Sequence, residues 1–160
     1  MHARARTLIH RLDLRPHPEG GHYRRLYQSQ HRWLTETGEH RSILTTIYYL
    51  LVAGEYSRWH RVDADEVWHH YEGDPLLLYC FDPAERIHTR HRLGGVTEDS
   101  TPVHVVPTGV WQAAEPLGSY TLAGCSVAPG FEFSGFSLIE EDEALRASLV
   151  EHLPDLARLL

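Results

Sequence analysis

The most informative segment of the chain is Gly54-Glu-Tyr-Ser-Arg-Trp-His60-Arg-Val62-Asp-Ala-Asp-Glu66-Val-Trp68-His-His70-Tyr-Glu-Gly73. Two runs rich in aromatic and β-branched residues flank acidic residues of the kind that make turns, which predicts two strands, Tyr56 to Val62 and Glu66 to Tyr71. Successive side chains of a strand point to opposite faces, so Glu66, Trp68 and His70 share one face. The segment therefore predicts a sheet that carries acid–base side chains.

The spacing of this segment resembles the first motif of the cupin superfamily: Gly, five residues, His-x-His, three or four residues, Glu, six residues, Gly. Gly54, His60, Glu66 and Gly73 match it, and Val62 replaces the second histidine. A weaker second motif is Pro107-Thr-Gly109-Val-Trp111-Gln112, in which Gln112 occupies the position of the last histidine. Further matches to the short single-domain cupins called Cupin-5 are residues 17–21, His-Pro-Glu-Gly-Gly, and residues 124–131, Gly-Cys-Ser-Val-Ala-Pro-Gly-Phe.

This resemblance implies an all-β fold, the cupin jelly-roll barrel or double-stranded β-helix, assembled as a homodimer. The pattern of the remaining chain agrees, because it holds nine strand-like runs separated by Gly, Pro and Asp. They are His22 to Gln30, Ile43 to Leu51, Tyr56 to Val62, Glu66 to Tyr71, Pro75 to Phe81, Arg86 to Arg92, Val103 to Val106, Gly109 to Ala113 and Tyr120 to Ala128.

With 160 residues and 18.4 kDa, the chain fits a single domain. Helical periodicity appears only near the ends, at Leu8, Ile9 and Leu12 and again at Leu145, Leu149 and Leu153. We therefore divide residues 1–160 into an N-terminal helix and arm (1–20), a jelly roll (21–138) and a C-terminal helix (139–160).

Composition excludes several functions. All fifteen basic residues are arginine, which rules out Schiff-base chemistry and a phosphate-binding lysine. A net charge of −7 without a recognition motif argues against a nucleic-acid partner, and the apolar runs are too short for a membrane span. The start of the chain lacks the pattern of a secretory signal, so we expect a cytoplasmic protein. The two cysteines, Cys80 and Cys125, lie in apolar strands without metal-ligand spacing and are expected to pack as small hydrophobic groups.

A metal site is one hypothesis for the barrel centre. In metal-dependent cupins the two histidines of His-x-His, the glutamate and the last histidine form the ligand shell, and this chain keeps only His60, Glu66 and Gln112. An amide oxygen is a poor ligand for zinc, iron or copper, and His70 lies ~13 Å along the strand from Glu66. We therefore expect no required cofactor, with a divalent transition metal on these three residues as the alternative.

Acid–base catalysis needs no metal. The resemblance to metal-free sugar-nucleotide epimerases of the same fold implies His60 as the base that removes a proton next to a carbonyl, with Glu66 as its charge partner. Tyr49 or Tyr120 could supply the acid. The ligand-binding candidates are Trp68, His70, Gln112, Tyr49 and Tyr120.

Three functions stay open. The first is a metal-independent isomerase or epimerase acting on a small carbohydrate-like molecule, which makes an enzyme the favoured class. The second is a non-catalytic small-molecule binder, and the third is a metal-dependent oxygenase or isomerase. Glu19-Gly20-Gly21 has two interpretations as well: a tight turn, or an arm that folds over a pocket mouth.

Overall fold

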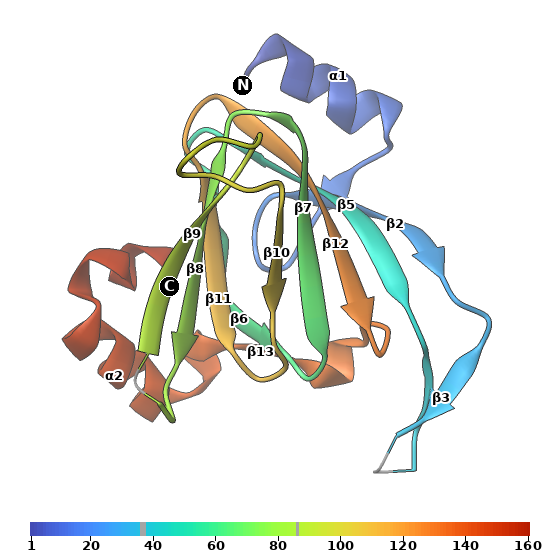
Figure 1. Ribbon diagram of the computed structural model, residues 1–160, viewed down its shortest axis with the longest axis vertical. Helices are drawn as coiled ribbons and strands as arrows, with labels where there is room; N and C mark the ends of the chain where they lie inside the picture. The colour runs from blue at the N-terminus through green and yellow to red at the C-terminus, as the bar shows by residue number, and fades with distance from the viewer. Residues whose placement is uncertain (36–37, 86) are drawn as a thin grey trace.

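The computed structural model describes residues 1–35, 38–85 and 87–160. Two antiparallel sheets face each other, and a short hairpin extends beyond them (Figure 1). The first sheet has the order β1 (Arg15–Pro16), β2 (His22–Gln28), β5 (Thr45–Val52), β12 (Tyr120–Ala128), β7 (Asp65–Gly73), β10 (Val103–Val106). The second has the order β13 (Phe136–Leu138), β6 (Ser57–Val62), β11 (Trp111–Pro116), β8 (Leu76–Asp82), β9 (Ile87–Leu93). The hairpin pairs β3 (Arg32–Leu34) with β4 (His40–Ser42).

The predicted jelly roll is confirmed, and each of the nine predicted strands is present. Their ends lie within about three residues of the predicted ones, and the bounds of β10 and β12 agree fully. The short strands β1, β3, β4 and β13 are additional to the predicted set. Arg86, which begins one of the predicted strands, lies outside the described residues.

The barrel interior follows the alternation predicted for β7. Trp68 lies in the main core cluster between the sheets and is 1% exposed, together with Leu78 and Cys80 of β8. Tyr71, an odd number of positions from Trp68, is 49% exposed on the outer face and stacks with His69. Side-chain parity along β7 thus selects which groups enter the barrel.

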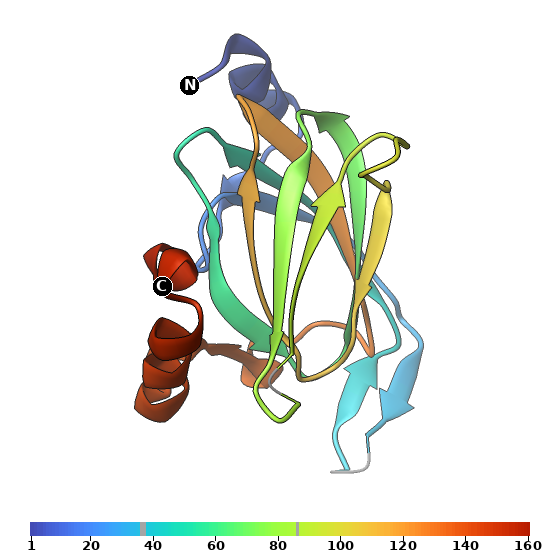
Figure 2. The ribbon, with the colours of Figure 1, turned by 60° about the vertical axis from the view of Figure 1, so that its left-hand side comes forward.

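Helices cover the outer face of each sheet (Figure 2). The N-terminal helix α1 (Ala3–Arg11) packs Ala5 and Leu8 against the outer side of the first sheet. At the other end, α2 (Glu143–His152) places Leu149 against Trp111 and Trp59, which point outward from the second sheet. No helix among the described residues is both long and apolar enough to cross a membrane.

The predicted helix over residues 139–160 is divided into three pieces. A 3-10 turn, η2 (Ile139–Glu141), precedes α2, and a second one, η3 (Pro154–Leu159), follows it. Asp142 caps α2 by accepting a hydrogen bond from the Leu145 backbone N–H, which satisfies one of the free donors at a helix start. Pro154 has no backbone N–H to continue the α-helix, so the last turn tightens into η3.

Candidate functional site

The strands β6 and β7 place His60 and Glu66 in one pocket at an end of the barrel. His60 is 2% exposed and Glu66 is 6% exposed. The pocket encloses about 550 Å³, counted with its mouth open to solvent. The space enclosed within its walls holds roughly three waters. A larger ligand would therefore extend through the open mouth. Its lining residues are His17, Glu19, Tyr23, Arg25, Thr45, Ile47, His60, Val62, Glu66, Cys125, Val127, Phe131 and Phe133.

The N-terminal arm supplies two of the polar groups in the pocket, His17 and Glu19. Glu19 is only 6% exposed, and its backbone C=O accepts a hydrogen bond from the Arg58 N–H of β6. The following residue, Gly20, has φ +116°, and a Cβ there would stand 2.1 Å from the backbone oxygen of Tyr56. Only glycine allows so close an approach, so the arm can cross β6 and direct Glu19 into the barrel.

His60 is held so that one ring nitrogen faces Glu19. Its Nδ1 lies 2.7 Å from the Arg58 carbonyl oxygen, which can only accept, so Nδ1 carries a proton. Its Nε2 lies 3.3 Å from Oε2 of Glu19. If neither atom carried a proton, a lone pair and a carboxylate would repel each other in a buried site. A proton that arrives between Nε2 and Oε2 would replace this repulsion by a hydrogen bond.

The second carboxylate oxygen of Glu19 is also engaged. Its Oε1 accepts a hydrogen bond of 2.9 Å from the Ser57 hydroxyl, so two β6 residues orient the carboxylate. His17 lies on the other side, with Nδ1 3.5 Å from Oε2 of Glu19 and 3.3 Å from the Glu19 backbone N–H. Burial lowers the pKa of His17 below its ordinary value of 6.5, although Glu19 opposes this shift. His17 is thus a neutral ring whose Nδ1 accepts a hydrogen bond.

Glu66 belongs to a separate hydrogen-bonded chain. Its Oε2 accepts from the Gln112 amide at 2.6 Å, and the Gln112 oxygen accepts from the Trp68 indole N–H at 2.8 Å. The buried Cys125 lines the same pocket as Glu66. Burial raises the pKa of Glu66 above its ordinary value of 4.5, while His60 counteracts the rise. The pocket therefore holds two carboxyl groups with different partners. Glu19 contacts His60, and Glu66 accepts a hydrogen bond from the Gln112 amide.

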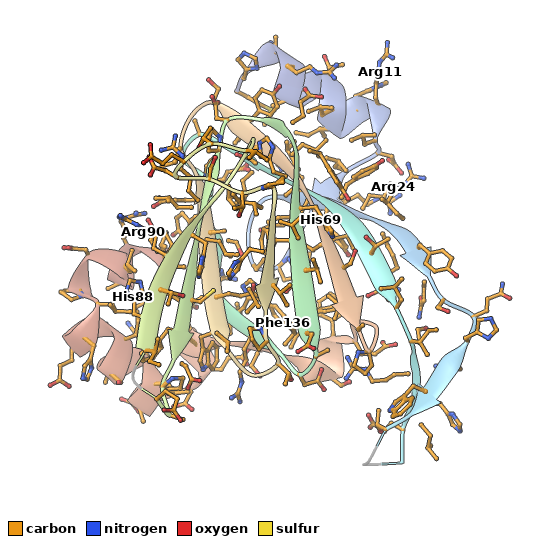
Figure 3. The ribbon with its side chains drawn as sticks, viewed as in Figure 1. Arg11, Arg24, His69, His88, Arg90 and Phe136 are labelled. Carbon is orange, nitrogen blue, oxygen red and sulfur yellow. The ribbon has the colours of Figure 1, made fainter. Side chains whose placement is uncertain are left out.

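Phe131 and Phe133 form apolar walls of the pocket, and Phe136 packs against His60. Phe136 of β13 stacks on His60 with ring centroids 5.6 Å apart, and Figure 3 shows it near the end of β6. Phe131 and Phe133 lie edge to face at 5.1 Å on the segment after β12. At the mouth, Arg25 of β2 is exposed and donates to the Gln28 amide oxygen at 2.9 Å. The pocket thus combines buried carboxyl and imidazole groups, aromatic walls and the Arg25 guanidinium at its mouth.

The structure places the other predicted ligand-binding residues at different points. Tyr49 lies directly behind the arm, where its hydroxyl donates to the Gly20 carbonyl at 2.9 Å. Burial raises the pKa of Tyr49 well above 10.0, so the phenol stays protonated. Trp68 is a core residue that orients Gln112. His70 faces the opposite end of β7, where its Nε2 is 3.3 Å from the Asp74 carbonyl oxygen. Neither Trp68 nor His70 lines the pocket.

Tyr120 is not where the acid–base hypothesis needs it. Its hydroxyl donates to Glu72 at 2.8 Å, and its ring packs in the cluster beneath α1, on the outer face of the first sheet. Cys125 of the same strand points into the pocket. The two residues are an odd number of positions apart, so they face opposite sides of β12, and Tyr120 cannot be the acid in the pocket.

The predicted metal ligands do not fit an ion at the barrel centre. The Gln112 oxygen already accepts the Trp68 N–H, so Gln112 presents an amide N–H group to Glu66 rather than a ligand atom. Val62 contributes no ligand at the position of the second cupin histidine. Among residues 1–35, 38–85 and 87–160, one group of three His, Cys, Asp or Glu residues has ligand atoms that all lie within 4.8 Å of one another. This group is Cys80, His91 and His104, elsewhere in the barrel.

Sequence reasoning missed His17 and Glu19 as members of the site. One interpretation of Glu19-Gly20-Gly21 was an arm over a pocket mouth, and the structure shows that the arm folds into the pocket of its own chain. The signal that could have found these residues is the glycine pair after a glutamate, because consecutive glycines permit close backbone approach.

The two sheets form a cupin barrel, and its pocket brings His17 and His60 together with Glu19 and Glu66. The chain matches the Cupin_5 family, described as Cupin superfamily (DUF985), over residues 6–139, and it belongs to that family.

Solved structures share the fold of this chain. A hypothetical protein from Leishmania major is 31% identical with a TM-score of 0.82, and the match covers 97% of this chain and 95% of that one. Protein SO0799 from Shewanella oneidensis is 32% identical with a TM-score of 0.80, over 96% and 92% of the two chains. A cupin 2 conserved barrel domain protein from Rhodopseudomonas palustris shares the fold at 11% identity and a TM-score of 0.58, over 89% and 81%. No curated protein matches the chain.

Proposed function

We propose that this cupin is a metal-independent isomerase or epimerase that moves a proton on a small carbohydrate-like molecule bearing a carbonyl group. The observation that carries the proposal is the buried contact of 3.3 Å between Nε2 of His60 and Oε2 of Glu19. Moving a proton from one position of a substrate to another is redox-neutral, so the chemistry needs no external electron donor or acceptor.

His60 and Glu19 would act as the base. Without a shared proton, the Nε2 lone pair and the carboxylate repel each other at low dielectric, and accepting a proton converts this repulsion into an ion pair. The hydrogen bond from Nδ1 to the Arg58 carbonyl fixes which nitrogen faces the pocket. Glu19 thereby takes the role that the sequence-based hypothesis gave to Glu66.

Glu66 would act as the acid. Burial raises its pKa, so the carboxyl group keeps its proton to higher pH than an exposed glutamate does. A base and an acid from two facing strands can remove a proton from one carbon and return one at a neighbouring atom, with no net change in protons. Arg25 at the rim would bind a carboxylate or phosphate group of the substrate.

The experiment is deuterium exchange. Hydroxy-carbonyl sugars and their phosphates are incubated with the protein in D₂O, and incorporation next to the carbonyl is followed by NMR. We expect wild-type protein to catalyse exchange on at least one compound and His60→Gln to lose it by about 100-fold or more, the usual contribution of a general base. Glu19→Gln should lose activity to a similar extent.

The matched control is His70→Gln, which changes the same residue type at a position away from the pocket. Its exchange rate should equal that of wild type. Equal exchange in His60→Gln would remove His60 from the mechanism. Saturable binding of the same compounds without any exchange would support the non-catalytic binder instead.

We further infer that the protein is cytoplasmic, a compartment in which its two buried cysteines stay reduced.

We also infer that the chain forms a homodimer. β1 covers β2 only at Tyr23 and His22, which leaves the rest of that edge without a partner strand among the described residues. Open edges invite pairing with another chain. Large apolar side chains surround this edge and the β3–β4 hairpin: Leu26 44%, Tyr27 51%, Trp33 57%, Leu34 58% and Ile43 44% exposed.

Light scattering after gel filtration tests the dimer. Wild type at micromolar concentration should have about twice the chain mass of 18.4 kDa. Trp33→Glu should shift it to the monomer mass, because a charge on an apolar interface is not compensated. Val96→Glu is the control, since Val96 is 83% exposed in the loop after β9. A wild-type mass of 18.4 kDa would overturn the inference.

A further inference from the structure

A second cluster of chemically active side chains lies inside the barrel but outside the pocket. Cys80 of β8, His91 of β9 and His104 of β10 all face inward, and none of them lines the pocket of His60 and Glu66. Each offers one ligand atom, and the three atoms lie within 4.8 Å of one another. The cluster is therefore separate from the site of the proposed function.

The cluster spans the open side of the barrel. β9 is the last strand of the second sheet and β10 is the last strand of the first, and these two edges are not hydrogen-bonded to each other as a strand pair among the described residues. Figure 2 shows them side by side, and their Cα traces are in contact. His91 and His104 meet across this seam with ring centroids 3.6 Å apart and an interplanar angle of 24°.

From these positions we propose that Cys80, His91 and His104 bind one divalent transition metal ion of the zinc class, which joins the two sheets at their open edge. A thiolate and two imidazoles are the donors that Zn²⁺, Co²⁺ and Ni²⁺ accept, whereas Mg²⁺ and Ca²⁺ prefer oxygen. Three protein ligands leave the fourth tetrahedral position for water. The half-buried histidines leave a path from solvent to the site.

The surroundings of the three residues favour metal binding. Burial lowers the pKa of both His91 and His104, which keeps the rings in the neutral form that binds metal. Nε2 of His91 lies 2.9 Å from the Thr89 hydroxyl, which can orient the ring and leave the other nitrogen for an ion. Among the described residues, no hydrogen bond engages the ring nitrogens of His104.

Two changes accompany binding. Burial raises the pKa of the Cys80 thiol to about 11, so the ion must displace its proton, and affinity will increase with pH. Ligand bonds of ~2.0 to 2.3 Å place the donor atoms of a tetrahedral site ~3.5 Å apart, so the stacked rings must also splay. Both changes cost free energy, and we expect micromolar rather than picomolar affinity.

The test uses tag-free protein stripped with a chelator and titrated with Co²⁺. A thiolate ligand gives cobalt a near-ultraviolet charge-transfer band, which histidines alone do not produce. We expect one Co²⁺ per chain with this band, displacement by Zn²⁺, and a melting temperature that rises with Zn²⁺ concentration, because an ion that binds only the folded state stabilises it.

The variants locate the ion. Cys80→Ser should abolish the charge-transfer band, and His104→Gln should weaken Co²⁺ binding by about 10-fold or more. Cys125→Ser is the matched control, because Cys125 is the other buried thiol and lies beside Glu66. Circular dichroism of each metal-free variant establishes that it is folded, and Cys80→Ala replaces Cys80→Ser if it is not.

Loss of the band in Cys125→Ser with retention in Cys80→Ser would place the thiolate–metal contact in the pocket and overturn the proposal. Cobalt binding without the band, or no binding at one equivalent per chain, would overturn it too. Proton exchange by the metal-free protein is measured in parallel, so failure of the metal site is distinguishable from failure of the proposed isomerase.

Discussion

Gly20→Ala is expected to lower the free energy of unfolding by about 3 kcal/mol or more. The added Cβ would stand 2.1 Å from the Tyr56 backbone oxygen, a contact that requires the arm or β6 to move. Movement of the arm breaks the hydrogen bond between the Arg58 N–H and the Glu19 carbonyl and the one between Tyr49 and the Gly20 carbonyl. Urea unfolding monitored by circular dichroism measures the loss.

Gly54→Ala is the matched control for this prediction. Gly54 also has a positive φ, +86°, but no atom lies within 4 Å of its added Cβ. Gly54→Ala should therefore lower the free energy of unfolding by about 1 kcal/mol, the cost of a positive φ at a residue other than glycine. If the free energy of unfolding falls equally in the two variants, close packing of the arm against β6 does not contribute to stability. Gly20→Ala should also lose proton exchange, since Glu19 leaves the pocket with the arm.

Glu66→Gln is expected to make the protein more stable and less active. The amide introduced at position 66 can still accept the Gln112 N–H but carries no charge into the barrel. In wild type, burial raises the folded-state pKa of Glu66 above its ordinary value of 4.5. The folded state then holds this proton more tightly than the unfolded state, so stability is highest below pH 4.5 and falls as pH rises through the folded-state pKa.

Glu66→Gln lacks this decline in stability with rising pH. Its free energy of unfolding should exceed that of wild type by about 1 to 2 kcal/mol at pH 8, as is typical when a strained functional group is replaced, and by less at pH 4.5. Proton exchange should fall by about 100-fold, because the variant has no acid. Urea unfolding at both pH values measures the stability difference. Glu98→Gln, an exposed carboxylate in the loop after β9, is the control and should show no such dependence. A variant less stable than wild type at pH 8 would contradict the prediction.

The strands and the inward face of β7 could be predicted because they depend on local alternation. Glu66 in the pocket and Trp68 in the core follow from a period of two along one strand. Tyr120 could have been excluded by the same rule, once Cys125 was placed inside the barrel. The hydrogen bond from Trp68 to Gln112 could not be predicted, since it joins two sheets whose relative placement no local pattern encodes.

Contacts between distant segments account for the rest. Glu19 reaches His60 only because the arm crosses β6 at a glycine. Cys80, His91 and His104 come from three separate strands, so a search for ligands at short spacing does not find them. Spacing along the sequence reveals metal ligands that lie on one strand or helix. These three residues come together only when the two sheets close into a barrel.

The hydrogen-bonded chain from Glu66 through Gln112 to Trp68 gives the protein an intrinsic optical reporter. A proton or ligand that changes the charge on Glu66 alters the hydrogen bond that Gln112 makes with the Trp68 indole, and indole emission responds to its electrostatic surroundings. Trp59 and Trp111 lie outside the barrel interior, beneath α2, and Trp33 lies on the hairpin. Fluorescence that is sensitive to replacement of Trp68 therefore reports events in the pocket without any added label.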